Sequence, residues 1–266
     1  MPRETFHQEL NQLAEEVVEL GREVDACLST MAQALEERDA EVASRVLGVD
    51  SRYKERGVEI DEECIMLQAR QAPVARDLRL IYTVQSVTHH LVRAGTLCEH
   101  ICQAIAETAG AEHDPNLQTA LLEMVRKTHS VFRQGLDVFE QREIDQAHDL
   151  EALDDKVDLL YSEVMNVAVN PNKEGSGSPQ WRVHAALSAH YLERIGDHTF
   201  FLVTGERIEQ TRPRIAQRGA AAEAGRTGLL TRCARPSCAK NARIATHPRP
   251  RPGGLTLQSL PRCSTH

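Results

Sequence analysis

Apolar residues recur every three or four positions along most of the first 210 residues of this 266-residue chain. In the opening stretch the steps are threes and fours only, at Phe6, Leu10, Leu13, Val17, Leu20, Val24, Leu28, Met31 and Leu35. This spacing places the side chains along one stripe of an α-helix, whereas a strand would need alternation at every second residue. The pattern therefore predicts an all-α protein whose long amphipathic helices pack stripe against stripe.

Interruptions of the spacing divide this region into six predicted helices. They cover approximately residues 6–37, 42–67, 80–109, 115–139, 143–169 and 180–210. Asp39 and Asp114 stand where a helix N-cap is expected, and Pro115 suits the first helical position. The composition of residues 170–179, rich in Gly, Ser, Asn and Pro, predicts a loop before the last helix.

The first three predicted helices resemble the last three in sequence. The stretch 35–39 matches 139–143, and Asp50 falls on Asp154 at the same offset. Gly95 then falls on Gly196 at an offset three residues shorter. An offset that persists through several landmarks indicates a duplicated unit. We therefore expect two tandem antiparallel three-helix bundles, formed by residues 1–110 and 111–213.

Residues 214–266 differ from the rest in composition. They hold ten basic residues and one acidic residue, a net charge of +9, and they show no helical periodicity. We expect a disordered basic tail here. Because the whole chain has a net charge of −8, the first 213 residues carry −17. A body this acidic argues against nucleic acid as its partner.

The sharpest candidate for chemistry is the pair of carboxylates at Glu193 and Asp197. On a helix these side chains stand one turn apart on the same face. Paired carboxylates suit a cation such as Mg, Mn, Fe or Zn, and Asp154 or Asp158 on the preceding helix is a candidate third ligand. The alternative is a solvated acidic face on which Arg194 makes local ion pairs.

A Leu-x-Arg-x-Gly frame occurs in both halves. Arg93 and Gly95 carry it in the first half, and Arg194 and Gly196 carry it in the second. We favour a packing role, in which glycine permits close helix contact and arginine pairs with an acid on a neighbouring helix. The alternative is that the arginines bind an anion or a partner.

Several signals of other protein classes are missing from the sequence. It contains no Gly-rich phosphate loop, no GxSxG and no nameable Ser/His/Asp set, so we expect no enzymatic activity. No apolar run reaches the length of a membrane span, and no secretory leader is present. Seven cysteines without a CxxC pair are typical of a reducing compartment. We therefore expect a cytoplasmic protein.

Four stretches of the sequence are specific when taken together. They are Phe6-His7-x-x-Leu10, Ala34-Leu35-x-x-Arg38-Asp39, Pro73-Val74-Ala75-Arg76-Asp77-Leu78-Arg79 and Tyr191-Leu192-Glu193-Arg194-Ile195-Gly196-Asp197-His198. With the doubled three-helix pattern, they resemble the PhoU family of bacterial regulators of phosphate uptake and phosphate signalling, over about residues 3–212. The tail has no counterpart in the family.

The resemblance implies a negative regulator of phosphate uptake and of the phosphate-starvation response. Such proteins are non-enzymatic adaptors between the PstB-type ATPase subunit of a phosphate transporter and a PhoR-type sensor kinase. We expect a homodimer that reaches the membrane only through these partners. The family carries an E/D-x-x-x-D metal motif in each repeat, and here only Glu193 and Asp197 keep it, because Val92 and Thr96 occupy the first-half positions. The alternatives are a metal-binding helical protein and a structural helical bundle or rod.

Overall fold

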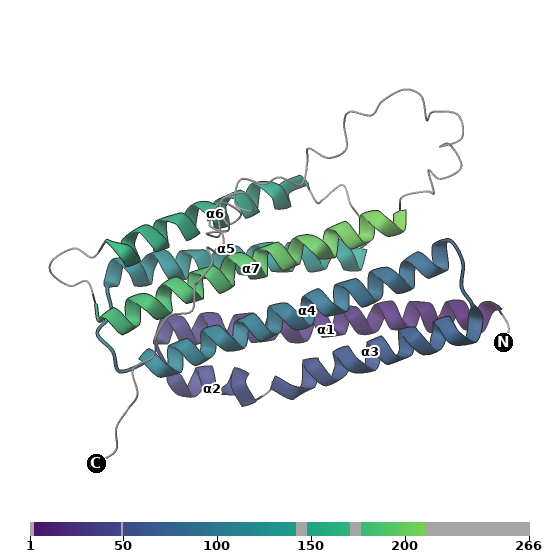
Figure 1. The fold of residues 1–266 in the computed structure, drawn as a ribbon, viewed down its shortest axis with the longest axis horizontal. Helices are drawn as coiled ribbons and strands as arrows, with labels where there is room; N and C mark the ends of the chain where they lie inside the picture. Colours follow the sequence, from purple (N-terminus) through teal and green to yellow (C-terminus); the bar gives the residue numbers. More distant parts are fainter. Residues whose placement is uncertain (1–2, 49, 142–147, 171–176, 211–266) are drawn as a thin grey trace, which may run out of the picture. The chain divides into compact units, whose positions relative to one another are not determined.

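The computed structural model describes residues 3–48, 50–141, 148–170 and 177–210, and these residues form seven helices (Figure 1). The helices are α1 (Arg3–Glu37), α2 (Ala40–Gly48), α3 (Asp50–Gln71), α4 (Arg76–Thr108), α5 (Pro115–Gln141), α6 (His148–Val169) and α7 (Pro179–Gln210). The described part of the chain contains no strand. The predicted all-α fold is confirmed. The predicted tail lies outside the described residues.

The apolar stripe of α1 forms much of the core of the first half. Each of the nine positions that the sequence pattern selects is at most 5% exposed; they are Phe6, Leu10, Leu13, Val17, Leu20, Val24, Leu28, Met31 and Leu35. A fully buried side chain of this size contributes about 1.5–3 kcal/mol relative to its exposed state. Burial of the stripe therefore makes a large contribution to holding this helix in the fold.

The expected second helix is two helices in the structure, and the prediction of one continuous helix was wrong. α2 ends at Gly48 and α3 begins at Asp50, while residue 49 lies outside the described residues. Glycine has a low helix propensity and is favoured where a helix ends, whereas aspartate is favoured where one begins. The apolar spacing continues across the break, which is why the pattern alone concealed it.

Two predicted helix starts are confirmed by capping hydrogen bonds. Asp39 Oδ1 accepts the backbone N–H groups of Glu41 at 2.7 Å and Val42 at 3.3 Å. Asp114 Oδ1 likewise accepts those of Asn116 at 2.8 Å and Leu117 at 3.3 Å. Each cap satisfies donors that the first helical turn leaves without an intrahelical partner.

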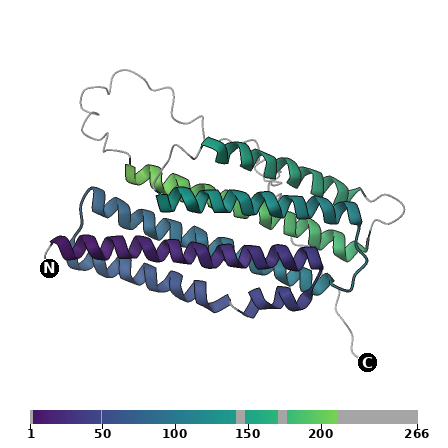
Figure 2. The ribbon, with the colours of Figure 1, turned by 180° about the vertical axis from the view of Figure 1, so that it is seen from behind.

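The helices of residues 1–213 belong to one compact unit. In the first half α4 packs against α1, α2 and α3, and in the second half α7 packs against α5 and α6 (Figures 1 and 2). The most extensive contact between two helices joins α4 to α7, so the third helix of each half forms the junction between the halves. This folding back excludes the single extended rod. The exact repeat boundaries at residues 110 and 213 stay a prediction.

Candidate functional site

The second-half motif lies near the middle of α7. Glu193 is half-buried with its side chain 17% exposed, whereas Asp197 one turn later is exposed. His190 Nδ1 lies 3.3 Å from Glu193 Oε2, an i,i+3 contact on the same helix face. The two carboxylates therefore share a face, as the spacing predicts, but they differ in their access to solvent.

α6 supplies two more carboxylates to this face, namely a buried Asp154 and a half-buried Asp158. We call Glu193, Asp197, Asp154 and Asp158 the acidic cluster. Burial, followed by the negative charges of Asp197, Asp158 and Asp154, raises the pKa of Glu193 to about 7, although Arg194 acts in the opposite direction. Like charges disfavour ionisation of a carboxyl group in this way. At neutral pH the cluster therefore carries electrostatic repulsion.

Repulsion of this kind is what a bound cation relieves, and carboxylate oxygen is a suitable ligand for Mg or Mn. However, no group of three or more His, Cys, Asp or Glu side chains converges on a common metal position among the described residues. The carboxylate oxygens of Glu193, Asp197 and Asp154 are suitable metal ligands, but the three side chains do not converge on one position. The metal site stays a prediction.

The two motif glycines allow their helices to approach neighbouring helices closely. A Cβ atom added at Gly95 would lie 2.7 Å from Cε2 of Tyr53 on α3. A Cβ atom at Gly196 would lie 3.3 Å from Oδ1 of Asp154 on α6. Both contacts are shorter than ordinary van der Waals contact. The geometry is that expected for a packing role of the glycines.

The two motif arginines lie on the third helix of each half, Arg93 on α4 and Arg194 on α7. Arg93 and Arg194 are both half-buried, yet neither makes a hydrogen bond or an ion pair with another residue in the described part of the chain. The charge of Arg194 still favours the ionised form of Glu193, and both the pairing role and the anion- or partner-binding role of the arginines stay predictions.

One polar network in the first half was not anticipated from the sequence. Glu99, buried on α4, accepts a hydrogen bond from the Tyr53 hydroxyl and forms an ion pair with Lys54 at 2.7 Å. Burial and the contact with Glu99 raise the pKa of Tyr53 well above its usual range, so its hydroxyl stays protonated as a donor. The sequence held one sign of this difference between the halves. At the repeat offset the basic residue Lys54 aligns with the acidic residue Asp158.

α4 and α7 run antiparallel along their contact, which we call the seam. His90 Nδ1 lies 2.9 Å from His198 Nδ1, and ten residues further along α4 the ring of His100 lies 5.3 Å from that of Tyr191. His90 also stacks on Phe201, with the ring centroids 4.2 Å apart. Burial and nearby positive charge lower the pKa of His198 to about 4, so it is neutral at physiological pH.

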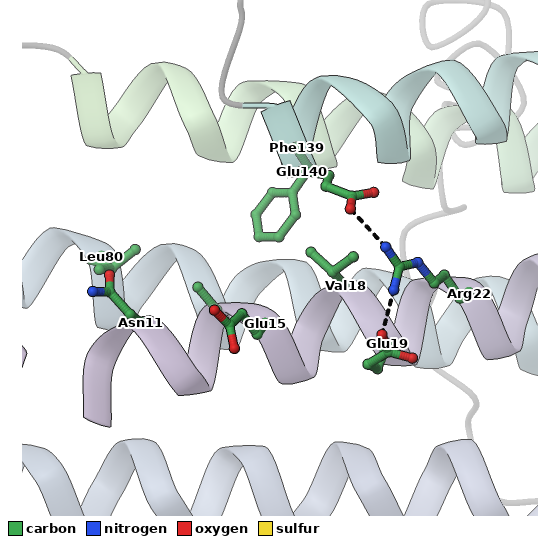
Figure 3. Close-up of a pocket in the computed structure, with 9 residues that line it drawn as sticks. Asn11, Glu15, Val18, Glu19, Arg22, Leu80, Phe139 and Glu140 are labelled. Atoms are coloured by element: carbon green, nitrogen blue, oxygen red, sulfur yellow. Dashed lines mark hydrogen bonds and ion pairs between the residues drawn. The ribbon is translucent and has the colours of Figure 1, made fainter. Parts of the chain in front are cut away.

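A groove lies elsewhere, between α1 of the first half and the end of α5 in the second (Figure 3). It has a volume of about 540 Å³, and Val18 and Phe139 line it beside charged side chains. Arg22 bridges Glu19 on its own helix and Glu140 on α5, the latter at 2.7 Å. Its lining combines apolar side chains with charged ones, a mixture that is common where proteins contact one another.

One contact has the composition of a hydrolytic triad but not its geometry. Ser29 Oγ lies 3.5 Å from His129 Nε2, and Asp25 Oδ1 lies 2.7 Å from the same nitrogen. A Ser-His-Asp relay needs serine and aspartate on opposite ring nitrogens. The arrangement is therefore a salt bridge beside a serine, and Arg133 joins it through Asp25 at 3.2 Å.

None of the described helices combines the length and the apolar character that would be needed to cross a membrane.

Comparison with known proteins places the chain in a family. The PhoU domain model matches residues 11–105 and again residues 121–200. A Clostridium acetobutylicum protein named as a phosphate-specific transport system accessory protein PhoU homolog is 29% identical over 217 residues, covering 79% of this chain and 99% of that protein. The Escherichia coli phosphate-specific transport system accessory protein PhoU is 30% identical over 192 residues, covering 72% of this chain and 79% of that protein.

Solved structures show the same fold. PhoU from Pseudomonas aeruginosa superposes with a TM-score of 0.71 at 23% identity, covering 77% of this chain and 98% of that one. The regulatory protein PhoU from Streptococcus pneumoniae gives a TM-score of 0.69 at 22% identity, covering 77% and 97%. The family model matches both halves of the helical body, and the fold agrees. The chain belongs to the PhoU domain family.

Proposed function

We propose that this protein is a negative regulator of phosphate uptake and of the phosphate-starvation response. It acts in the cytoplasm as an adaptor between the PstB-type ATPase of a phosphate transporter and a PhoR-type sensor kinase, without a reaction of its own. The observation that carries the proposal is the double match to the PhoU domain, together with relatives named as accessory proteins of phosphate-specific transport.

A second groove in the first half supports a docking role. Glu9, Glu59, Glu62 and Glu63 line it beside Met66, between α1 and α3, and we call it the acidic groove. Its volume is about 430 Å³. Burial and the charges of Glu16, Glu59 and Glu9 raise the pKa of Glu63, so carboxylates are crowded here. A cationic partner surface would relieve that crowding.

Apolar side chains continue the acidic groove on the outer face of α3. Val58 and Ile65 are each 58% exposed, and Met66 is 48% exposed. Exposed apolar residues rimmed by charge are typical of protein interaction sites. We therefore assign the acidic groove to an amphipathic, basic segment of one of the two partners.

The test is complementation of a bacterial strain that lacks its own PhoU protein, with an alkaline phosphatase reporter in phosphate-rich medium. We expect the wild-type chain to restore repression and to co-purify with the tagged ATPase or kinase. The triple variant Glu59→Lys, Glu62→Lys, Glu63→Lys should lose the co-purification and derepress the reporter. A matched triple of exposed acids on other helices, Glu41→Lys, Glu123→Lys, Glu163→Lys, makes the same change in net charge and should behave as wild type.

Failure of the wild-type chain to repress would remove the regulatory function itself. If it represses, yet both triple variants behave alike, the adaptor role stands and the acidic groove is not its docking surface. Light scattering of the purified protein tests the expected homodimer in the same preparation.

A cation at the acidic cluster is a second candidate function, because three neighbouring carboxylates raise the pKa of Glu193. Metal analysis of the purified protein should then find a stoichiometric ion that Glu193→Ala removes and that Glu163→Ala on the outer face of α6 retains. Equal metal content in both variants would contradict the assignment to Glu193, Asp197 and Asp154.

A further inference from the structure

The seam has local twofold symmetry. His100 faces Tyr191 across it, and the helices run in opposite directions. Gly95 lies five residues before His100, and Gly196 lies five residues after Tyr191. Because the two helices are antiparallel, this register places the two motif glycines at the same height along the seam. Because these glycines are equivalent positions of the two halves, the local twofold axis passes between them.

Arg93 and Arg194 follow this symmetry. Each precedes its glycine by two residues, which is about 3 Å along the helix, on opposite sides of the axis. Arg93 lies three residues after His90, and Arg194 lies four residues before His198, so both lie on the stripes that meet at the seam. A twofold axis between antiparallel helices places equivalent side chains on one face of the pair. The two long side chains therefore converge from opposite helices.

Neither guanidinium group forms a hydrogen bond or a close ion pair with a described side chain, although the charge of Arg194 favours the ionised form of Glu193. Both are half-buried and lack a hydrogen bond or an ion pair there, although an unpaired cation loses solvation when it is partly buried. Both arginine charges act on one neighbouring side chain, His198. The pKa of His198 is lowered first by burial, then by His90, and then by the charges of Arg194 and Arg93. Two half-buried arginines without a salt bridge are unexpected in a body whose net charge is −17.

We propose that Arg93 and Arg194 form a binding site for a tetrahedral oxyanion across the seam. A planar guanidinium group donates two parallel hydrogen bonds to two oxygens of such an ion, and a tetrahedral ion has enough oxygens to accept from both arginines at once. The ion joins α4 of the first half to α7 of the second. The site goes beyond the adaptor function and needs no partner protein.

Calorimetric titration with inorganic phosphate at constant ionic strength tests the site on the full chain. We expect saturable binding to one site per chain, with sulfate competing and chloride at equal ionic strength failing to displace it. Arg93→Gln and Arg194→Gln should each weaken binding by about tenfold or more, because each removes charge-assisted hydrogen bonds. The double variant should show no saturable binding.

Arg126→Gln is the matched control, because Arg126 is 65% exposed and pairs with Glu36 at 3.1 Å. It should bind phosphate within about twofold of wild type, as expected for an exposed ion pair away from the site. Thermal unfolding supplies a second measurement. Without phosphate the double variant should be at least as stable as wild type, since it loses two half-buried cations. Phosphate should raise the unfolding midpoint of wild type and of Arg126→Gln but not that of the double variant.

A folded wild-type protein that shows no saturable binding of phosphate or sulfate would overturn the proposal, as would a double variant that binds like wild type. Neither result depends on the reporter strain, so the oxyanion site and the regulatory function fail or survive separately.

Discussion

The contact of α3 with α4 in the first half and the contact of α6 with α7 in the second occupy equivalent places in the repeat but differ in chemistry. In the first half the ring of Tyr53 fills the space beside Gly95, and its hydroxyl and Lys54 neutralise Glu99. In the second half Val157 and Asp158 stand at the positions aligned with Tyr53 and Lys54. There Gly196 faces Asp154 instead of an aromatic ring.

The difference shows how a duplicated unit divides its tasks. The first-half contact is apolar, filled and electrically paired, so it contributes to stability. The second-half contact gathers the acidic cluster, whose repulsion is unfavourable for folding and is retained at the expense of stability. Groups that reduce stability in this way are typical of functional sites.

The largest effect that separates the two contacts is expected from the glycines. Gly95→Ala places a methyl group 2.7 Å from a tyrosine ring that is 1% exposed and cannot move into solvent, so we expect a loss of about 2–3 kcal/mol in the free energy of unfolding. Gly196→Ala meets only a carboxylate oxygen at 3.3 Å and gains helix propensity, so it should change stability by less than about 1 kcal/mol. Urea denaturation compares the two, and equal losses would contradict the distinction.

A smaller effect is expected at the hydroxyl of Tyr53. Tyr53→Phe keeps the ring beside Gly95 but removes the hydrogen bond to Glu99. The free energy of unfolding should fall by about 1.5–3 kcal/mol. We expect a value toward the lower end of this range, because Lys54 still neutralises the carboxylate. Tyr82→Phe is the control, since Tyr82 is 60% exposed and should show no measurable change. An unchanged unfolding free energy in Tyr53→Phe would show that the network is not stabilising.

A further effect concerns pH. Because the pKa of Glu193 is raised from 4.5 to about 7, the folded protein holds this proton more tightly than the unfolded chain between those values. Stability therefore falls as pH rises from about 4.5 to 7, and above that window the loss is complete. Glu193→Gln should match wild type near pH 4 and exceed it in thermal midpoint at pH 8. A constant difference across the range would contradict the raised pKa.

Local patterns in the sequence predict the local parts of the structure. The stripe on α1 and the caps at Asp39 and Asp114 depend on neighbours within four residues, and the structure confirms them. The break at Gly48 was missed because the apolar spacing runs through it without change. Its signal was a glycine followed closely by an aspartate.

Properties that depend on distant residues could not be obtained in this way. The contact of Glu99 with Tyr53 joins residues 46 positions apart, and its existence depends on how α3 turns toward α4. The lack of a hydrogen bond or close ion pair at Arg93 and Arg194 among the described residues depends on the placement of neighbouring helices, which no spacing rule gives. Whether Glu193, Asp197 and Asp154 hold a metal depends on side-chain positions to within fractions of an ångström, and that remains a prediction.

The central claim is that Glu193 and Asp197, the carboxylates that only the second half keeps, contribute to the proposed regulation, whereas Val92 and Thr96 at the equivalent first-half positions only pack. The most direct measurement is alkaline phosphatase activity in phosphate-rich medium, in strains complemented at equal protein levels. One strain carries the second-half double variant, Glu193→Ala with Asp197→Ala, and the other carries the first-half double variant, Val92→Ala with Thr96→Ala. We expect the second-half pair to derepress the reporter and the first-half pair to repress it as wild type does. Full repression by the second-half pair would contradict the claim.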